Sequence, residues 1–336
     1  MILIDAIYIY DGGGKVLFDL LVDELQKKPV DIYYLVDKRI ESDFRKKNLN
    51  KITFLKPSLG SRTLFYIRNY LKFRTVFCFS NIPPPIPLPS NIITYFHNVL
   101  YLEKFSQEGL KLNLMAFLKK GVAFVLRNNT NIWVVQTEHI RKKMENVWQI
   151  PTTKIRVLPF YKELAPEKEF NKKSNEIIKF LYVSAGHKHK NHALLLRAFA
   201  RFVKAFPNSQ LYITIGSDFP DLIKKIHEYN IPQIVNLGNL PIEEIVGWYL
   251  KTDIIIYPSL HESFGLGLIE ASKFSLPIMA ADLPYVYSVV TPNMVFDPLS
   301  EESIFYSLIK YQTIIGSKST CNCESKLEEL ITLITE

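Results

Sequence analysis

Short apolar runs of strand length alternate with longer segments whose apolar residues recur at helical spacing. In the first half of the chain this pattern predicts strands over 2–9, 31–36, 51–55, 75–79, 92–96 and 131–136, and helices over 15–28, 61–73, 111–127 and 137–147. Such alternation is typical of α/β domains built on parallel sheets. The proline-rich segment 82–89 interrupts it and is expected to form a stiff connector, because proline lacks the backbone N–H that helices and central strands use.

The same pattern restarts after a polar stretch, Lys162 to Lys179, that is rich in Lys, Glu, Asn and Ser and predicts an interdomain linker. Beyond it we expect strands over 178–183, 210–215, 233–237, 253–257 and 276–280, and helices over 190–205, 219–229, 241–250 and 266–274. The length of 336 residues suits two domains. We therefore predict two doubly wound, Rossmann-like domains, over 1–160 and 175–315, with a helical tail over 316–336. Their ligands should bind beyond the carboxyl ends of the strands, in a central cleft.

Composition narrows the class of protein. Hydrophobic residues make up 48% and charged residues 22%, and no apolar run is long enough for a membrane span. The apolar N-terminus lacks the basic flank and cleavage site of a signal peptide, so it is expected to be a buried strand. Three cysteines, an odd and sparse set, argue against a disulfide framework and for a reducing, cytoplasmic location.

Positive charge is concentrated in one region. Residues 51–130 contain 11 Lys or Arg and two Asp or Glu, whereas the rest of the chain is nearly balanced and the total is +8. Segments 62–74 and 117–127 mix these cations with aromatic and aliphatic residues, which favours peripheral binding to an anionic membrane surface. Two ordinary amphipathic helices with solvated basic faces would give the same pattern. Nucleic acid is not expected as a partner, since no RNA- or DNA-binding motif accompanies the charge.

The strongest chemical signal is YPSLHESFGLGLIEA over residues 257–271, which runs from a strand end into a helix. Ser263 is the expected N-cap, and Gly265 and Gly267 allow a ligand to approach the backbone. The helix N-terminus suits a diphosphate, while Glu262 and Glu270 lie on either side of it, with Glu270 expected about two turns into the helix. A carboxylate accepts two hydroxyl hydrogen bonds at once, so this layout fits a sugar at one end and a ribose at the other.

A second strand–turn–helix signal is FLYVSAGHKHKNHALLL over residues 180–196. Lys190, at the expected start of the helix, offers a positive charge to a diphosphate. The neighbouring histidines have no carboxylate or cysteine at ligand spacing, so no metal site is expected. The first glycine-rich turn, DGGGK over 11–15, fails both the dinucleotide fingerprint and the P-loop, because Val16 and Leu17 stand where those motifs need other residues.

Together these segments resemble the retaining glycosyltransferases of family 4, which have the GT-B fold. The resemblance implies that Glu262 contacts the donor sugar and Glu270 the ribose. It implies further donor contacts from Ser263, Phe264, Gly265 and Leu266, from the VNLGNLP loop at Gly238, Asn239 and Leu240, from Ser184, Gly186, Lys188, Lys190 and Asn191, and from Gly13 and Gly14 in the first turn. The family often has an arginine before the lysine; this chain lacks it, and Lys188 is the candidate replacement. A histidine at the strand end YFHN, His97, is expected to face the donor sugar.

The resemblance also implies an activity. A hexose would pass from a UDP- or GDP-linked donor to a saccharide or polyprenyl-diphosphate-linked acceptor, in O-antigen or capsule synthesis at the inner face of the cytoplasmic membrane. Anomeric configuration would be retained, with no cofactor or metal, and with His97, Glu262 and Lys190 as the catalytic residues. Two alternatives stay open: a non-hydrolysing sugar-nucleotide epimerase of GT-B shape, and a non-catalytic partner subunit that binds a nucleotide sugar or a membrane.

Overall fold

The computed structural model describes residues 1–103, 114–164 and 177–336, with side chains described from 118 onward in the second range. The chain forms two compact units: unit 1 comprises 1–162 and 324–336, and unit 2 comprises 163–323. The predicted linker falls mostly on 165–176, outside the described residues. The prediction of a helical tail over 316–336 is wrong for its first part. Gly316 adopts a left-handed φ of 77°, and β15 (Thr320–Cys321) pairs with β13 (Val290–Thr291), so only α12 (Leu327–Thr335) is helical, and it belongs to unit 1.

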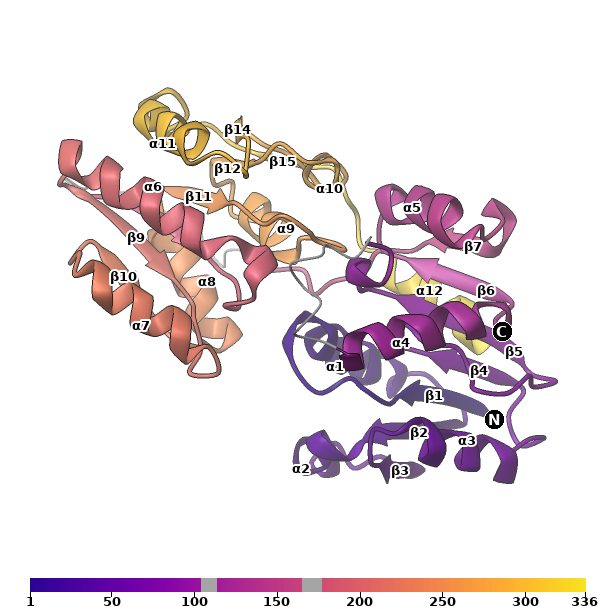
Figure 1. The fold of residues 1–336 in the computed structure, drawn as a ribbon. Coiled ribbons are helices and arrows are strands. Elements are labelled where there is room, and N and C mark those ends of the chain that lie inside the picture. Colours follow the sequence, from indigo (N-terminus) through magenta and orange to yellow (C-terminus); the bar gives the residue numbers. More distant parts are fainter. Residues whose placement is uncertain (104–113, 165–176) are drawn as a thin grey trace. The chain divides into compact units, whose positions relative to one another are not determined.

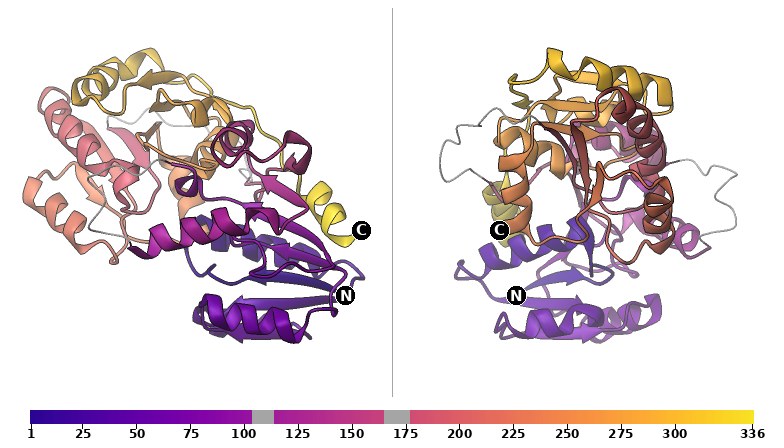
Figure 2. Two further views of the ribbon diagram at one scale, coloured as in Figure 1. Left: turned by 45° about the vertical axis from the view of Figure 1, so that its right-hand side comes forward. Right: turned by 90° about the vertical axis from the view of Figure 1, so that its left-hand side faces the viewer.

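Unit 1 is a seven-stranded parallel sheet in the order β3-β2-β1-β4-β5-β6-β7, with helices on both faces (Figure 1, Figure 2). Its strands are β1 (Ile2–Ala6), β2 (Ile32–Asp37), β3 (Ile52–Leu55), β4 (Thr75–Cys78), β5 (Asn91–Phe96), β6 (Ile132–Val135) and β7 (Ile155–Val157). Its further helices are α1 (Gly12–Leu25), α2 (Glu41–Arg45), α3 (Leu59–Arg68), α4 (Leu114–Val125) and α5 (Glu138–Trp148). The six predicted strands and four predicted helices are confirmed. The three-residue β7 and the five-residue α2 were too short to show a periodic pattern.

Unit 2 repeats the architecture with a six-stranded parallel sheet in the order β10-β9-β8-β11-β12-β14. Its strands are β8 (Ile178–Tyr182), β9 (Ser209–Ile213), β10 (Ile234–Asn236), β11 (Ile254–Tyr257), β12 (Ile278–Ala281) and β14 (Met294–Phe296). Its helices are α6 (His192–Ala205), α7 (Pro220–Tyr229), α8 (Ile242–Lys251), α9 (Leu266–Lys273), α10 (Pro284–Tyr287) and α11 (Glu301–Ile309). The five predicted strands and four predicted helices are again confirmed, while β14, α10 and α11 were not predicted.

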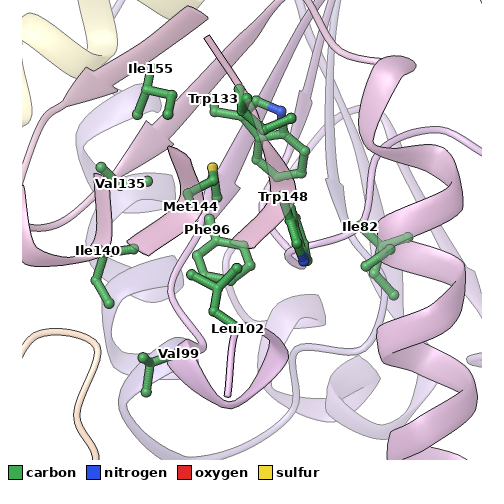
Figure 3. Close-up of a cluster of buried hydrophobic side chains, with 12 residues drawn as sticks. Ile82, Phe96, Val99, Leu102, Trp133, Val135, Ile140, Met144, Trp148 and Ile155 are labelled. Carbon is green, nitrogen blue, oxygen red and sulfur yellow. The ribbon is translucent and has the colours of Figure 1, made fainter. Parts of the chain in front are cut away.

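Aromatic side chains hold helix α5 onto the sheet of unit 1 (Figure 3). Trp133 of β6 and Trp148 of α5 meet edge to face with ring centroids 5.5 Å apart, and Phe96 of β5 meets Trp148 in the same way at 5.3 Å. Edge-to-face pairs add about 0.5–1.5 kcal/mol to the burial of apolar area. The cluster therefore ties the last part of unit 1 to the middle of its sheet.

A buried ion pair connects α3, β1 and the proline-rich segment 82–89. Arg62 Nε donates to Asp5 Oδ2 at 2.7 Å, and the Tyr66 hydroxyl donates to the same oxygen at 2.7 Å. The rest of the guanidinium donates to the carbonyls of Ile82 and Pro83, each at 2.9 Å. Segment 82–89 forms neither helix nor strand, as predicted, and it accepts hydrogen bonds from this buried arginine and, at the Pro84 carbonyl, from the Asn129 amide.

No helix among the described residues is long and apolar enough to cross a membrane.

Replacing Arg62 with methionine is expected to destabilise unit 1 by about 3–5 kcal/mol, because Asp5 would keep a buried charge without its partner. Urea denaturation followed by tryptophan fluorescence is suited to this test, since Trp133 and Trp148 both lie in unit 1. Arg68→Met is the matched control: this arginine is exposed on the same helix, so its loss should change stability by less than about 0.5 kcal/mol. Equal effects of the two variants would contradict the buried-pair interpretation.

Candidate functional site

Two loops meet at the carboxyl edge of the sheet in unit 2. Strands β8 and β11 are parallel neighbours, so the loops that follow them, 183–191 and 258–265, leave the same edge side by side. The His189 carbonyl joins the loops: it accepts a hydrogen bond from Leu260 N at 2.7 Å and another from the Ser259 hydroxyl at 3.3 Å. The Asn191 amide donates to the carbonyls of Pro258 and Pro298. The two sequence motifs are therefore one structural unit.

The predicted Lys190 and Glu262 come into direct contact. Lys190 Nζ donates to Glu262 Oε1 at 2.5 Å, and the Tyr257 hydroxyl donates to the same oxygen at 3.0 Å. The Tyr182 hydroxyl donates to the Lys190 carbonyl at 2.9 Å, which fixes the loop beneath the ammonium group. The lysine and glutamate side chains are only 15% and 11% exposed, so the pair is shielded from water but reachable by a ligand.

Lys190 does not enter the helix, contrary to the prediction. Residues Lys188–Lys190 form a short 3-10 turn, and α6 begins at His192 after Asn191, whose φ of 60° is left-handed. The side chain of Lys188 is exposed and forms no ion pair with described residues, so it is available to an anion. Gly186 is required by packing, since a Cβ there would come within 2.6 Å of the Phe219 side chain.

The helix predicted over 266–274 is confirmed as α9 (Leu266–Lys273), but its N-cap differs from the prediction. Ser263 is not the N-cap, because Gly265 adopts a left-handed φ of 77° and α9 begins at Leu266. Glu270 therefore lies about one turn into the helix, roughly 6 Å along its axis, and not two turns. Ser263 and Phe264 lie in the turn before α9, and the Phe264 side chain is buried. The N-terminus of α9 still follows Glu262 directly through this turn.

Glu270 carries a half-buried carboxyl that forms a hydrogen bond with Tyr249. The Tyr249 hydroxyl of α8 donates to Glu270 Oε2 at 2.8 Å. Burial raises the pKa of Glu270 to about 7, and the hydrogen bond from Tyr249 opposes this rise. Near neutral pH the group is therefore partly protonated, so it can both donate to and accept from ligand hydroxyls. Tyr249 was not predicted as part of the site; its position on α8 gives no sequence signal.

The loop after β10 lies at the same edge of the sheet. Asn236 Oδ1 accepts hydrogen bonds from Ile215 N at 2.8 Å and from Gly238 N at 3.2 Å, and its amide donates to the Ile215 carbonyl at 3.0 Å. Gly238 has a left-handed φ of 73°, which turns the chain toward Asn239 and Leu240. Asn236 was also missed from the sequence, although an asparagine at a strand end before glycine is a typical turn signal.

Histidines near Lys190 are neutral packing groups. The Ser184 hydroxyl lies 2.9 Å from His192 Nε2, and the Ser184 amide donates to Thr214 Oγ1 at 3.0 Å. Burial lowers the pKa of His189 and of His192 to about 4 each, so neither is charged at neutral pH. In the described part of the chain no group of histidine, cysteine or carboxylate side chains could hold a metal ion.

In unit 1 the structure brings Gly14 and His97 together. Gly12–Gly14 form the first residues of α1, and a Cβ on Gly14 would lie 3.2 Å from His97 Nε2, whereas Gly13 faces open space. The His97 amide donates to Asn81 Oδ1 at 2.7 Å, and the ring packs on Phe79 with centroids 5.2 Å apart. Burial lowers the pKa of His97 to about 4. Among the described residues, no hydrogen-bond partner meets its Nδ1.

Comparisons with known proteins identify similar sequences and folds. Residues 163–309 match the family model described as "Glycosyl transferases group 1". The O-antigen chain mannosyltransferase RfbU of Salmonella typhimurium is 23% identical over 322 residues, 89% of this chain and 87% of that protein. Alpha-monoglucosyldiacylglycerol synthase of Acholeplasma laidlawii is 30% identical over 45% of this chain. In three curated relatives, the Acholeplasma enzyme included, the match spans only 24% to 41% of the relative's length.

A solved structure with the same fold is that of Anabaena HepE in complex with UDP and glucose, with a TM-score of 0.67 and 11% identity over 100% of this chain and 96% of the other. Two parallel α/β sheets with a ligand-competent carboxyl edge define the GT-B fold class. Within that class, the chain is similar to group 1 glycosyltransferases over residues 163–309.

Glu270 is expected to make the stability of unit 2 depend on pH. Its pKa is about 7 in the folded chain and near 4.5 ordinarily, so the folded state binds the proton more tightly, and stability is lost as pH rises from 4.5 through 7. Glu270→Gln removes that loss. Relative to the wild type, the free energy of unfolding of the variant should therefore increase by about 3 kcal/mol as the pH rises through this range, and its unfolding temperature should increase with it. Thermal unfolding between pH 5 and 8 measures the difference.

Tyr249→Phe is the companion variant. It removes the hydrogen bond that favours the ionised carboxylate, so the pKa of Glu270 in the folded state should rise further. The pH range over which stability is lost should therefore extend to higher pH. A difference between Glu270→Gln and wild type that stays constant with pH would refute the assignment.

Proposed function

We propose that this protein is a glycosyltransferase that moves a hexose from a nucleotide-diphosphate sugar to a saccharide acceptor during synthesis of a surface polysaccharide. The observation that carries the proposal is the contact of Lys190 with Glu262, in front of α9 and Glu270, within the residues that are similar to group 1 glycosyltransferases. The bound UDP and glucose of the HepE structure support a nucleotide-sugar donor, and the names of RfbU and other relatives support the polysaccharide setting.

The donor diphosphate would replace Glu262 as the partner of Lys190. A diphosphate near the start of α9 competes with Glu262 for the Lys190 ammonium, since both are anions. Once Lys190 turns to the diphosphate, Glu262 keeps the Tyr257 hydrogen bond and is free to accept hydroxyls of the sugar. Glu270, one turn further along, would hold the ribose diol, and the turn at Gly238 to Leu240 would lie beside the base. UDP or GDP is the expected carrier.

The same groups would stabilise the leaving diphosphate. Negative charge builds on it as the bond to the sugar breaks, and Lys190, the free N–H groups of α9 and the exposed Lys188 would oppose that charge. Lys188 would take the place of the arginine that the family 4 pattern has. The reaction would retain anomeric configuration by attack on the same face, without a metal or cofactor. These features rest on the resemblance to family 4.

In unit 1, His97 and Gly13 and Gly14 would contact the substrates. A neutral His97 with an unpaired Nδ1 can donate or accept one hydrogen bond, which suits a sugar hydroxyl better than a phosphate. The acceptor would be a saccharide carried on a polyprenyl diphosphate, presented at the inner face of the cytoplasmic membrane, to which the basic region 51–130 would bind. The relatives are named as transferases, which favours transfer over the epimerase and the non-catalytic subunit.

The donor site is tested by thermal stabilisation with UDP, GDP, ADP and dTDP. A nucleotide at a hundred times its dissociation constant should stabilise the wild type by about 2.7 kcal/mol, and Glu270→Ala should lose the effect. Glu243→Ala, an exposed glutamate on α8, is the control that should keep it. Stabilisation by none of the four, or equal stabilisation of the Glu270 variant, would overturn the donor-site assignment.

His97→Ala is expected to reduce turnover about 100-fold while leaving nucleotide stabilisation unchanged, because the ring would act on the sugar and not on the nucleotide. His227→Ala, which changes an exposed histidine in the last turn of α7 in unit 2, should leave turnover intact. Sugar transfer from the donor identified above provides the assay. Full activity of the His97 variant would remove this residue from the mechanism.

A further inference from the structure

A surface pocket of unit 1 lies apart from the residues discussed so far. It has a volume of about 400 Å³ and is formed by helices α3 and α4 and by the proline-rich segment, with a lining that includes Leu59, Thr63, Pro85, Leu118, Gly121 and Val125. Thr63 carries the one polar side chain of the lining, and its hydroxyl already donates to the Leu59 carbonyl at 2.8 Å. Among the side chains of the described lining residues, only the Thr63 oxygen can still accept a hydrogen bond, so the pocket favours an apolar ligand.

Large apolar side chains of the two helices that form the pocket are exposed, some in the lining and some beyond it. Leu118 and Val125 of α4 are 50% and 72% exposed, and Leu64 and Ile67 of α3 are 46% and 57% exposed. Leu71, just beyond α3, is 81% exposed. Large apolar residues gathered in this way mark a binding surface, whereas single ones do not.

Cations lie beside the lining residues along the chain, and no acid is among the described lining residues. Neither α3 nor α4 contains an aspartate or glutamate. Lys56, three residues before Leu59, and Arg68, at the end of α3, are exposed and form no ion pair with described residues. Arg127 follows the lining residue Leu126, and its guanidinium stacks on the Phe124 ring at 3.9 Å. An apolar pocket with positive charge around it complements an amphiphile with a hydrocarbon chain and an anionic head.

We infer that the pocket between α3 and α4 takes up one acyl chain of an anionic membrane phospholipid, with the surrounding cations binding its phosphate. This inference deepens the membrane part of the proposed function and rests on it. A peptide would bring backbone N–H and C=O groups that the lining cannot satisfy, and a nucleic acid has no hydrocarbon chain to fill it. The protein would thereby be held to the membrane by specific lipids as well as by a diffuse positive field.

Gly121 provides the decisive substitution. A Cβ on this residue meets no atom within 4 Å, so a leucine fits without strain and projects into the pocket that Gly121 lines. Leucine also favours helix more than glycine does, so the variant should fold at least as well as the wild type. Gly247→Leu in α8 is the matched control, since this glycine also faces open space in a helix, but in unit 2.

The probe is dansyl-undecanoic acid, whose fluorescence rises in an apolar site, displaced by lysophosphatidylglycerol below its micelle concentration. Wild type and Gly247→Leu should bind the probe and release it to this lipid. Gly121→Leu should bind at least about tenfold more weakly, because excluding two methylene groups has an effect of that size. Lysophosphatidylcholine should displace the probe about tenfold less well than lysophosphatidylglycerol, since its head has no net charge.

Equal probe binding by Gly121→Leu and Gly247→Leu would overturn the inference. Displacement by farnesyl diphosphate but not by lysophosphatidylglycerol would also overturn it, and would assign the pocket to the prenyl chain of the acceptor. UDP or GDP stabilisation is measured on the same samples. If the wild type binds UDP or GDP but neither the probe nor the lipid, only the lipid site is refuted. If the wild type binds the probe and the lipid but neither nucleotide, only the donor site is refuted.

Discussion

The parallel pairing of β8 with β11 is the constraint on which the site in unit 2 depends. Parallel neighbours place their carboxyl ends at one edge of the sheet, so loops separated by some 70 residues along the chain must meet there. The His189 carbonyl then joins the loops through two hydrogen bonds, and the Asn191 amide adds a third connection. Lys190 and Glu262 approach each other because their backbones are held in this way.

Burial gives the groups at this edge their chemical character. Lys190 and Glu262 are mostly removed from water, so each charge is stabilised by the other. A diphosphate that replaces Glu262 at the ammonium group meets a positive charge that is already in position. Burial raises the pKa of Glu270 to about 7, so its carboxyl holds its proton up to about neutral pH. The tyrosines at 182, 249 and 257 supply hydroxyls from the core side and fix the geometry of all three residues.

Unit 1 has the same architecture, but its ion pair has a structural role. Its ion pair, Arg62 with Asp5, is fully buried and serves the proline-rich segment. That segment in turn supplies Pro85 to the apolar pocket beside α3 and α4. One arginine of the basic region is therefore structural, while Lys56 and Arg68 remain exposed for an anionic partner. Net charge along the sequence could not separate these two roles, because only burial distinguishes them.

The sequence by itself determined the two α/β units, nearly all of their elements and the residue types of the site. Apolar periodicity is a local property, and the paired motifs around Lys190 and Glu262 are short, so both can be read along the chain. Elements too short to show a periodic pattern, such as β7, were not predicted. The N-cap of α9 was assigned to the wrong residue, because the left-handed conformation of Gly265, and not the capping preference of Ser263, begins the helix.

Only the tertiary structure decided which side chains complete the site. Tyr249 lies in no motif and Asn236 was not selected from its motif, yet Tyr249 supports Glu270 and Asn236 shapes the turn at Gly238. The pKa values of Glu270 and His97 and the path of 324–336 back to unit 1 are likewise invisible in the sequence. The physical reason is common to all of them: desolvation and hydrogen bonding depend on residues distant in the chain, and these meet only when the sheets are assembled.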